Sequence, residues 1–595
     1  MKTSSEAGRS SFLPSGQQRL RWWLGLVDWL RPRELQITLV LAGVAGFFGA
    51  VGSLAFRRAT EAVHWLWTGS WEAGLSESFA HLPAWQRMVV PTAGGAVAGL
   101  VLMFSARFVR QSRTTDYMEA VVIGDGILST RQSLLKSLSA LFSISSGGSI
   151  GREGPLVQLA AMLASAMGRI LHVANPRLRL LVACGAAAGI ASAYNAPVAG
   201  ALFVAEVVMA TTSMEVFGPL VCSSVVATLT IRQFLGADPL YSVVDFNAIS
   251  PVQTLILVGL GCLCGFLSPA YLLILRSVES WFSFWPGPIF TRLAAGGLVV
   301  GVVAVWYPQV CGNGYSEVNA VLHGRWPWQE LAIVSVLKIV ATSATFGSGA
   351  VGGVFTPTLF VGSSIGYLFG VLAKALSGIA AIQPEVFALI GMGAFLAATT
   401  RAPLMAIILI FEITLDYEVI LPLMLACVVG YYTARSFPVP GIYSEELRRK
   451  GRWEFDSELR RMRVGDIMKT DPPTVHLDAA FDEICKRFTL LPYNFLYVVD
   501  DQGCFQGAIA LHDIKRFLTN PDLAEVIIAR DIMQEQFPSL RPDDFLTTVF
   551  ERFSRHDDER LPVLATDGSK RLLGAVSKAD ALLAFAERPT EPARL

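Results

Sequence analysis

Two glycine-rich stretches inside apolar sequence carry the residues with the clearest chemistry. Residues 145–155 read Ser-Ser-Gly-Gly-Ser-Ile-Gly-Arg-Glu-Gly-Pro, and residues 345–357 read Thr-Phe-Gly-Ser-Gly-Ala-Val-Gly-Gly-Val-Phe-Thr-Pro. Glycines let backbone N–H groups approach a ligand closely, and a helix that begins just after them points its positive end at that ligand. Two such loops in corresponding parts of a membrane protein indicate a binding site near the membrane midplane. Because amide dipoles rather than fixed cations dominate the site, it suits a small anion that must bind and also leave.

Glu153 lies between the glycines of the first stretch, where a helix is predicted to begin. A carboxylate in a membrane-embedded setting is costly to bury and marks a functional site by default. The structural alternative is a carboxylate that only complements the positive end of the helix dipole. The functional interpretation is favoured.

The composition is that of a membrane protein with a soluble region. Of 595 residues, 53% are hydrophobic and 16% are charged, whereas soluble domains carry about 25% charged residues. The deficit is confined to residues 35 to about 440, and the last 140 residues have an ordinary soluble composition. The net charge is zero, so no basic field predicts a nucleic-acid partner. The eight cysteines are scattered without metal-ligand spacing, so no metal site is predicted.

An internal repeat organises the apolar region. Residues 184–197 and residues 391–403 both end in Ala-Pro, and in both a Gly stands twelve residues before the proline and a Glu nine after it, at Glu206 and Glu412. Many apolar runs are interrupted by Gly, Pro and Ser, and broken helices are tolerated in a bilayer only around a protein-lined cavity. We expect an all-α polytopic domain over residues 33–440, with repeats at about 35–235 and 252–440 of inverted topology.

The ends of the chain predict the topology. Residues 1–32 form an amphipathic segment with Arg beside Trp, typical of a membrane interface, and the positive-inside rule places it in the cytoplasm. After a linker at 441–462, Val464-Gly-Asp-Ile-Met recurs as Ala529-Arg-Asp-Ile-Met. This repeat predicts two small α/β modules at 463–520 and 525–590. Both termini are expected in the cytoplasm, with the chain embedded in the inner membrane.

These motifs resemble the ClC family of chloride channels and chloride/proton antiporters, and most closely its bacterial voltage-gated chloride channel subfamily. The matching residues are Gly-Arg-Glu-Gly-Pro at 151–155, Gly-Val-Phe-Thr-Pro at 353–357 and Tyr443 in Gly-Ile-Tyr-Ser, while the C-terminal repeats resemble a CBS pair. The resemblance implies the ClC fold and a homodimer in which each subunit has its own pore.

The resemblance also assigns roles to individual residues. Glu153 becomes the gating glutamate, which competes with the anion for its site until it is protonated. Lys136 matches a lysine that raises the local potential. For Tyr443 the alternative is an interfacial tyrosine, and for Arg152 it is pairing with protein groups. The expected anion-binding residues are Gly151, Arg152, Gly154, Gly353, Val354, Phe355 and Tyr443.

Two positions depart from the family pattern. Antiporters carry a proton-path glutamate directly after the position of Glu206, but here that residue is Val207, which cannot carry protons. The first anion loop, usually Gly-Ser-Gly-Ile-Pro, falls at residues 110–120. If the two sequences are aligned without gaps, Arg113 falls at the position of the family's serine. Ser112, Thr114 or Thr115 could supply a hydroxyl at that position only if the alignment is shifted by a small gap. Chloride is therefore the family default, with nitrate or another halide left open.

The resulting prediction is a chloride-selective channel, not an enzyme, that conducts passively and shunts charge across the membrane. A chloride/proton antiporter is the alternative, disfavoured by Val207. A nucleotide-dependent membrane enzyme is unlikely because no Gly-Lys-Ser/Thr follows either glycine loop. No resident cofactor is expected beyond an adenine nucleotide at the CBS pair, where Asp513 and Asp580 match ribose-binding aspartates. The alternative is that the pair only assembles the dimer.

Overall fold

The computed structural model describes residues 34–71, 74–108, 116–122, 124–211, 213–237, 239–241, 251–379, 381–443, 462–490, 494–518, 526–555 and 559–581. The predicted amphipathic segment at 1–32, residues Ser112 to Thr115 of the first anion loop and most of the 441–462 linker lie outside these ranges. The chain divides into two compact units, Met1–Leu447 and Arg448–Leu595, and each is described by itself.

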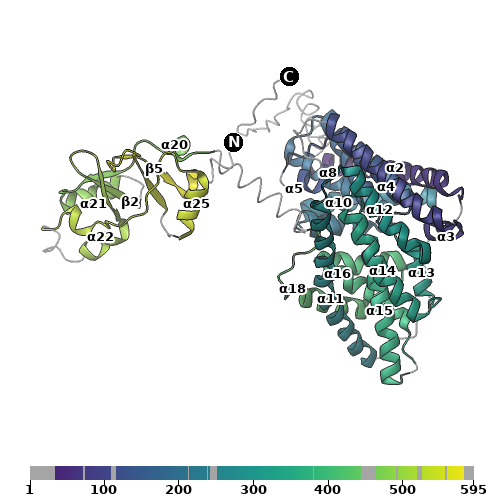
Figure 1. Ribbon diagram of the computed structural model, residues 1–595. Coiled ribbons are helices and arrows are strands. Elements are labelled where there is room, and N and C mark those ends of the chain that lie inside the picture. The colour runs from purple at the N-terminus through teal and green to yellow at the C-terminus, as the bar shows by residue number, and fades with distance from the viewer. Residues whose placement is uncertain are drawn as a thin grey trace, which may run out of the picture. The chain divides into compact units, whose positions relative to one another are not determined.

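In its described part, the first unit is built of helices of very different lengths that lie at different tilts (Figure 1). In chain order these are α2 Glu34–Thr68, α3 Leu75–His81, α4 Ala84–Phe108, α5 Tyr117–Val122, α6 Thr130–Ser145, α7 Glu153–Ile170, α8 Asn175–Tyr194, α9 Pro197–Leu202, the π-helical turn η1 Phe203–Val208, α10 Met214–Leu235, α11 Pro251–Ser283, α12 Ile289–Trp306, the 3₁₀ turn η2 Pro308–Val310, α13 Tyr315–Leu322, α14 Trp328–Gly347, α15 Phe355–Ser377, α16 Pro384–Thr400, α17 Pro403–Thr414 and α18 Ile420–Arg435.

Within the described ranges, seven helices are long and apolar enough to cross a membrane, namely α2, α4, α10, α11, α12, α14 and α15. Four further apolar segments are shorter, at Pro197–Val208, Pro384–Thr400, Pro403–Thr414 and Ile420–Arg435. A full span needs about 20 residues. The interruptions in the sequence therefore produce partial helices, as expected.

The two Ala-Pro motifs fold in the same way. Helix α8 is followed by Asn195, whose φ is 57°, and α9 begins two residues later at Pro197. Helix α16 is followed by Arg401, whose φ is 64°, and α17 begins at Pro403. A left-handed residue ends a helix, and proline is suited to the first position of the next because its φ is fixed and it lacks an N–H. The sequence repeat is therefore a repeat of helix–break–helix structure.

Glycines allow the helices of the second repeat to pack closely. A Cβ atom on Gly366 of α15 would lie 2.0 Å from the Phe387 carbonyl oxygen of α16, and one on Gly391 would lie 2.5 Å from the Gly362 carbonyl oxygen. Small residues at such crossings let helix backbones approach each other inside a membrane. This packing fixes α15, whose first residues form part of the candidate site.

In its described residues, the second unit forms two small sheets, to which the labelled strands β2 and β5 of Figure 1 belong. In one, β1 Thr474–His476 runs parallel to β2 Phe495–Val499, which is antiparallel to β3 Phe505–Ala510; in the other, β4 Arg560–Leu564 is antiparallel to β5 Leu572–Ser577. The helices are α20 Val464–Ile467, α21 Phe481–Leu490, α22 Leu511–Leu518, α24 Ala529–Ile532 and α25 Leu546–Arg555.

The two modules of this unit exchange their first segments. Val464 is buried in a core with Leu540 and Leu561 of the later module. Ala529, in the second copy of the same motif, is buried with Leu496 of the earlier module. The exchange explains why the repeated Asp-Ile-Met motifs precede each module: each one completes the hydrophobic core of the other module.

Candidate functional site

The two glycine-rich loops meet through a pair of backbone hydrogen bonds. The Gly151 N–H donates to the Gly353 carbonyl at 2.6 Å, and the Gly353 N–H donates to the Gly151 carbonyl at 2.9 Å. Helices α7 and α15 each begin two residues after these glycines, at Glu153 and Phe355. The N-terminal, positive ends of two helices are therefore brought together, as an anion site requires.

Glycine is required at position 151 because the Glu153 side chain folds back over it. A Cβ atom on Gly151 would lie 1.8 Å from Glu153 Oε2, and one on Gly353 would lie 2.9 Å from the same oxygen. Any side chain at Gly151 would displace the carboxylate. The glycines predicted as anion-binding residues thus make room for Glu153 in this structure.

Glu153 is 3% exposed, and its two carboxylate oxygens have very different surroundings. Oε1 accepts hydrogen bonds from the Tyr194 hydroxyl at 2.6 Å, from the Thr356 N–H at 2.8 Å and from the Thr356 hydroxyl. Oε2 is buried and has no hydrogen-bond partner within the described residues. One oxygen is therefore held by two donors of Thr356 at the start of α15 and by Tyr194 at the end of α8, while the other is held by none of the described residues.

The N–H groups of Val354 and Phe355, which the sequence predicts as anion ligands, lie beside the donor that Glu153 uses. The first N–H groups of a helix have no acceptor within the helix. In the part of the chain that the structure describes, these two donate to no other protein group either. They remain available to a ligand, whereas the Thr356 N–H is taken by the carboxylate.

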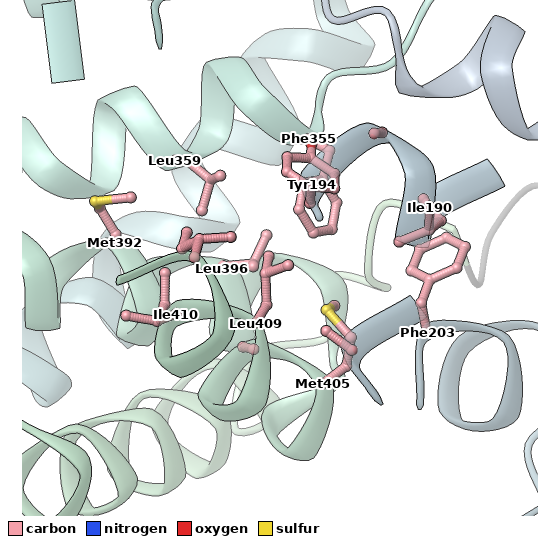
Figure 2. Close-up of a cluster of buried hydrophobic side chains, with 14 of the residues drawn as sticks. Ile190, Tyr194, Phe203, Phe355, Leu359, Met392, Leu396, Met405, Leu409 and Ile410 are labelled. Atoms are coloured by element: carbon pink, nitrogen blue, oxygen red, sulfur yellow. The ribbon is translucent and has the colours of Figure 1, made fainter. Parts of the chain in front are cut away.

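Aromatic side chains surround this site and connect Tyr443 to it. The Tyr194 and Phe355 rings lie 5.3 Å apart, and Phe203 lies 6.3 Å from Phe355. Figure 2 shows Tyr194 and Phe355 together, with Phe203 to one side. Tyr443 packs edge-on against Phe203, with ring centroids 5.4 Å apart. The structure thus brings Tyr443 next to the aromatic group that borders Glu153.

Arg152 does not approach the Glu153 carboxylate. Its guanidinium carbon lies 5.3 Å from the centroid of the Tyr315 ring, and Tyr315 in turn packs against Tyr194 at 6.5 Å. A guanidinium over an aromatic face is attracted by the ring quadrupole. The Tyr315 ring is thus one protein partner of Arg152, and contact of Arg152 with an anion stays a prediction.

A family model described as voltage gated chloride channel matches residues 94–435, and a CBS domain model matches residues 464–520 and 529–587. A ClcB-like chloride channel protein of Ralstonia nicotianae is 49% identical over 415 residues, 69% of this chain and 96% of that protein. The voltage-gated ClC-type chloride channel ClcB of Escherichia coli (strain SMS-3-5 / SECEC) is 37% identical over 414 residues, 68% of this chain and 98% of that protein. This chain belongs to the ClC family.

Solved ClC structures have the same fold. A slow cyanobacterial Cl⁻/H⁺ antiporter superposes with a TM-score of 0.63 at 27% identity, covering 69% of this chain and 97% of that one. A eukaryotic CLC transporter superposes with a TM-score of 0.58, covering 91% of this chain and 97% of that one; at 19% identity it shows the fold alone. The predicted helical ClC fold and CBS pair are confirmed.

Sequence reasoning missed two residues that hold Glu153 and one buried lysine elsewhere in the membrane domain. Tyr194 and Thr356, which hold Glu153, stood inside recognised motifs but received no role. Lys338 of α14 is fully buried and donates to the carbonyls of Val310 at 2.9 Å and Gly312 at 2.8 Å. The sequence did contain a signal for it, because Lys338 precedes Gly353 by fifteen residues, as the half-buried Lys136 of α6 precedes Gly151.

The two repeats also brace each other through Glu206 and Glu412. Glu206 Oε2 accepts from the Met405 N–H at 2.8 Å, at the start of α17. Glu412 Oε2 accepts from the Ala199 N–H at 2.7 Å, at the start of α9. Each glutamate therefore caps the Ala-Pro helix of the other repeat, which supports a structural role for both. Val207, at the antiporter glutamate position, follows Glu206 on the π-helical turn η1.

In the CBS unit, both predicted nucleotide-binding aspartates stabilise helix starts. Asp513 accepts from the Ala510 N–H and from Gln534, each at 3.2 Å. Asp580 accepts from the Ser577 hydroxyl at 2.6 Å and lies 2.8 Å from Lys469 Nζ. Burial disfavours the ionised form of Asp580, but the hydrogen bonds from Lys469 and Ser577 outweigh it, so the pKa of Asp580 lies below its ordinary value. Nucleotide binding stays a prediction.

We predict that Glu206→Ala and Glu412→Ala each destabilise the membrane domain. Each substitution removes an acceptor of two backbone N–H groups, and loss of such a helix cap costs about 0.5–2 kcal/mol. The thermal unfolding temperature of the detergent-solubilised protein should fall by a few degrees. Glu418→Ala, which changes an exposed glutamate, is the control. Unchanged stability with abolished transport in Glu206→Ala would contradict the structural role.

Proposed function

We propose that this ClC protein is a chloride-selective channel whose conduction is gated by the Glu153 carboxylate. The observation that carries the proposal is the position of this carboxylate at the start of α15, where Oε1 takes the Thr356 N–H and the hydroxyls of Tyr194 and Thr356. These are neutral donors at the positive end of a helix, the groups that a permeating anion needs. A carboxylate and a chloride ion cannot occupy them at the same time.

In this mechanism, protonation opens the pathway. A neutral carboxylic acid is a weaker acceptor than a carboxylate, so it is held less firmly by the three donors. The acid then leaves them to chloride, together with the N–H groups of Val354 and Phe355. Tyr443 would add a hydroxyl donor, while Lys136 would raise the potential without contacting the ion. Conduction should therefore increase as pH falls.

Val207 supports a channel over a chloride/proton antiporter. An antiporter needs a second protonatable group on the path of the proton, and a valine side chain cannot bind a proton. The runner-up remains an antiporter that manages without that glutamate, because the 27% identical cyanobacterial neighbour is named as a Cl⁻/H⁺ antiporter. Nitrate and other halides are the alternative anions. The proposal also places the protein in the inner membrane with both termini in the cytoplasm, where it would shunt charge. We further propose that it is a homodimer, and light scattering on the purified protein would measure the mass of the assembly.

We predict chloride flux without coupled proton movement. Purified full-length protein in liposomes with a chloride gradient would be studied at a membrane potential set by potassium and valinomycin. A channel dissipates the chloride gradient while the pH remains constant. Uphill proton movement driven by chloride would establish the antiporter instead. If other anions move but chloride does not, the chloride assignment is wrong.

Substitutions at the gate should have graded effects in the same assay. Glu153→Gln removes the charge, so chloride flux should be high and independent of pH. Tyr194→Phe removes one of the three donors to Oε1 and leaves the carboxylate in place. A hydrogen bond to a charged group contributes about 1.5–3 kcal/mol, so flux at neutral pH should rise roughly ten- to a hundredfold and still depend on pH.

Tyr241→Phe is the matched control for this series. Tyr241 is another fully buried tyrosine, but its hydroxyl has no partner within the described residues. Its substitution should leave the flux and its pH dependence unchanged. If Glu153→Gln keeps the pH dependence of the wild-type protein, Glu153 is not the gate.

The CBS unit is proposed to bind an adenine nucleotide that regulates conduction. Radiolabelled ATP should bind saturably to the full-length protein, and Asp513→Ala should weaken this binding. Asp567→Ala, in a turn where Asp567 accepts hydrogen bonds from Ser569, should not. Absence of saturable binding at millimolar nucleotide would leave the pair with an assembly role alone.

A further inference from the structure

A small pocket lined by Arg152, the residue before Glu153, is unused by the mechanism above. Its cavity volume is about 10 Å³, room for one body of about the size of a water molecule and far too little for an organic ligand. Four helices of the first repeat, α2, α7, α8 and α10, supply its lining. Its lining residues are Ser53, Leu54, Arg57, Arg152, Leu156, Ser192, Ala193, Ile231 and Leu235. We call it the arginine pocket.

The arginine pocket has an excess of positive charge. Arg57 of α2 and Arg152 at the start of α7 both line it, and the two guanidinium groups repel each other. Arg57 Nε donates to Glu61 at 3.2 Å, but the same carboxylate is shared with Arg58 at 3.1 Å. One carboxylate thus serves two guanidinium groups, and Arg152 makes only its ring contact with Tyr315 within the described residues. Such an arrangement is stabilised by an anion between the arginines.

Two serine hydroxyls in the pocket lack partners. Ser53 is 3% exposed and Ser192 is 8% exposed. Neither Oγ atom has a hydrogen-bond partner within the described residues. Buried polar groups in folded proteins are almost always hydrogen-bonded, to protein or to a bound species. Since a hydroxyl can donate to an anion, the two serines point to a small ligand in this pocket.

We propose that the arginine pocket binds a single small inorganic anion, chloride in the function proposed above. The choice of chloride rests on that proposed function, whereas the site itself follows from two guanidinium groups and two unpartnered hydroxyls. Arg152 directly precedes Glu153 in the chain, so an anion bound to Arg152 would lie next to the gate. Arg152 is also the residue at the N-terminal end of α7, where the helix dipole is positive. The pocket therefore concentrates the ion next to the point where the carboxylate must leave.

Bromide, a heavier halide, allows the site to be observed directly. Crystals of the full-length protein grown in bromide should show an anomalous scattering peak among Arg57, Arg152, Ser53 and Ser192. Arg57→Gln and Ser53→Ala should weaken or abolish it. Ser53→Ala removes only a buried hydroxyl without a partner, so this variant should fold. Arg58→Gln is the matched control, because Arg58 shares Glu61 with Arg57 but is exposed and does not line the pocket.

Flux measurements provide the second readout. Because charge-assisted hydrogen bonds are stronger than neutral ones, Arg57→Gln should raise the chloride concentration that gives half-maximal flux by roughly three- to tenfold, with the pH dependence unchanged. Arg58→Gln should match the wild-type protein. A wild-type structure with bromide elsewhere but none in the pocket overturns the proposal. Bromide in the pocket of a protein that does not transport chloride would instead retain the site and refute the channel.

Discussion

The exchange of two backbone hydrogen bonds between Gly151 and Gly353 is the constraint on which the site depends. It joins two loops from different repeats and fixes the starts of α7 and α15 face to face. Two positive helix ends would repel each other without negative charge between them. The Glu153 carboxylate supplies that charge from α7 and takes two of its three donors from Thr356 of α15. The two helix ends can therefore lie close together because an anionic group lies between them.

The same reciprocity recurs away from the site. Glu206 caps α17 of the second repeat, and Glu412 caps α9 of the first. Each interruption of a helix at an Ala-Pro motif leaves N–H groups without an acceptor in the helix. Within a membrane no water is available to accept their hydrogen bonds. The partner repeat supplies the acceptor in both cases. Neither repeat can satisfy its broken helices alone, so the two are held in one arrangement around the loops.

Local features of the fold could be predicted from the sequence, whereas long-range partners could not. The glycine loops, the Ala-Pro interruptions and the CBS repeats could be predicted because residue types and spacing within short segments indicate them. The donors to Glu153 are not, because Tyr194 and Thr356 lie 41 and 203 residues away from it in the chain. Lys338 could have been found by comparing its distance from Gly353 in the chain with that of Lys136 from Gly151. No comparable pattern in the sequence indicates Arg57 or Ser53. The exchange of segments between the CBS modules could not be predicted either, because a repeated sequence does not show whether each motif packs in its own module or in the other one.

The uneven surroundings of the Glu153 carboxylate fit the proposal that this buried group is a gate. A carboxylate satisfied at both oxygens would be held too firmly to move, and one satisfied at neither would be too costly to bury. Here Oε1 has three donors and Oε2 has none within the described residues. In the proposed mechanism a proton would bind to Oε2 and remove the charge that holds Oε1. The N–H groups of Val354 and Phe355 would then be left to a chloride ion.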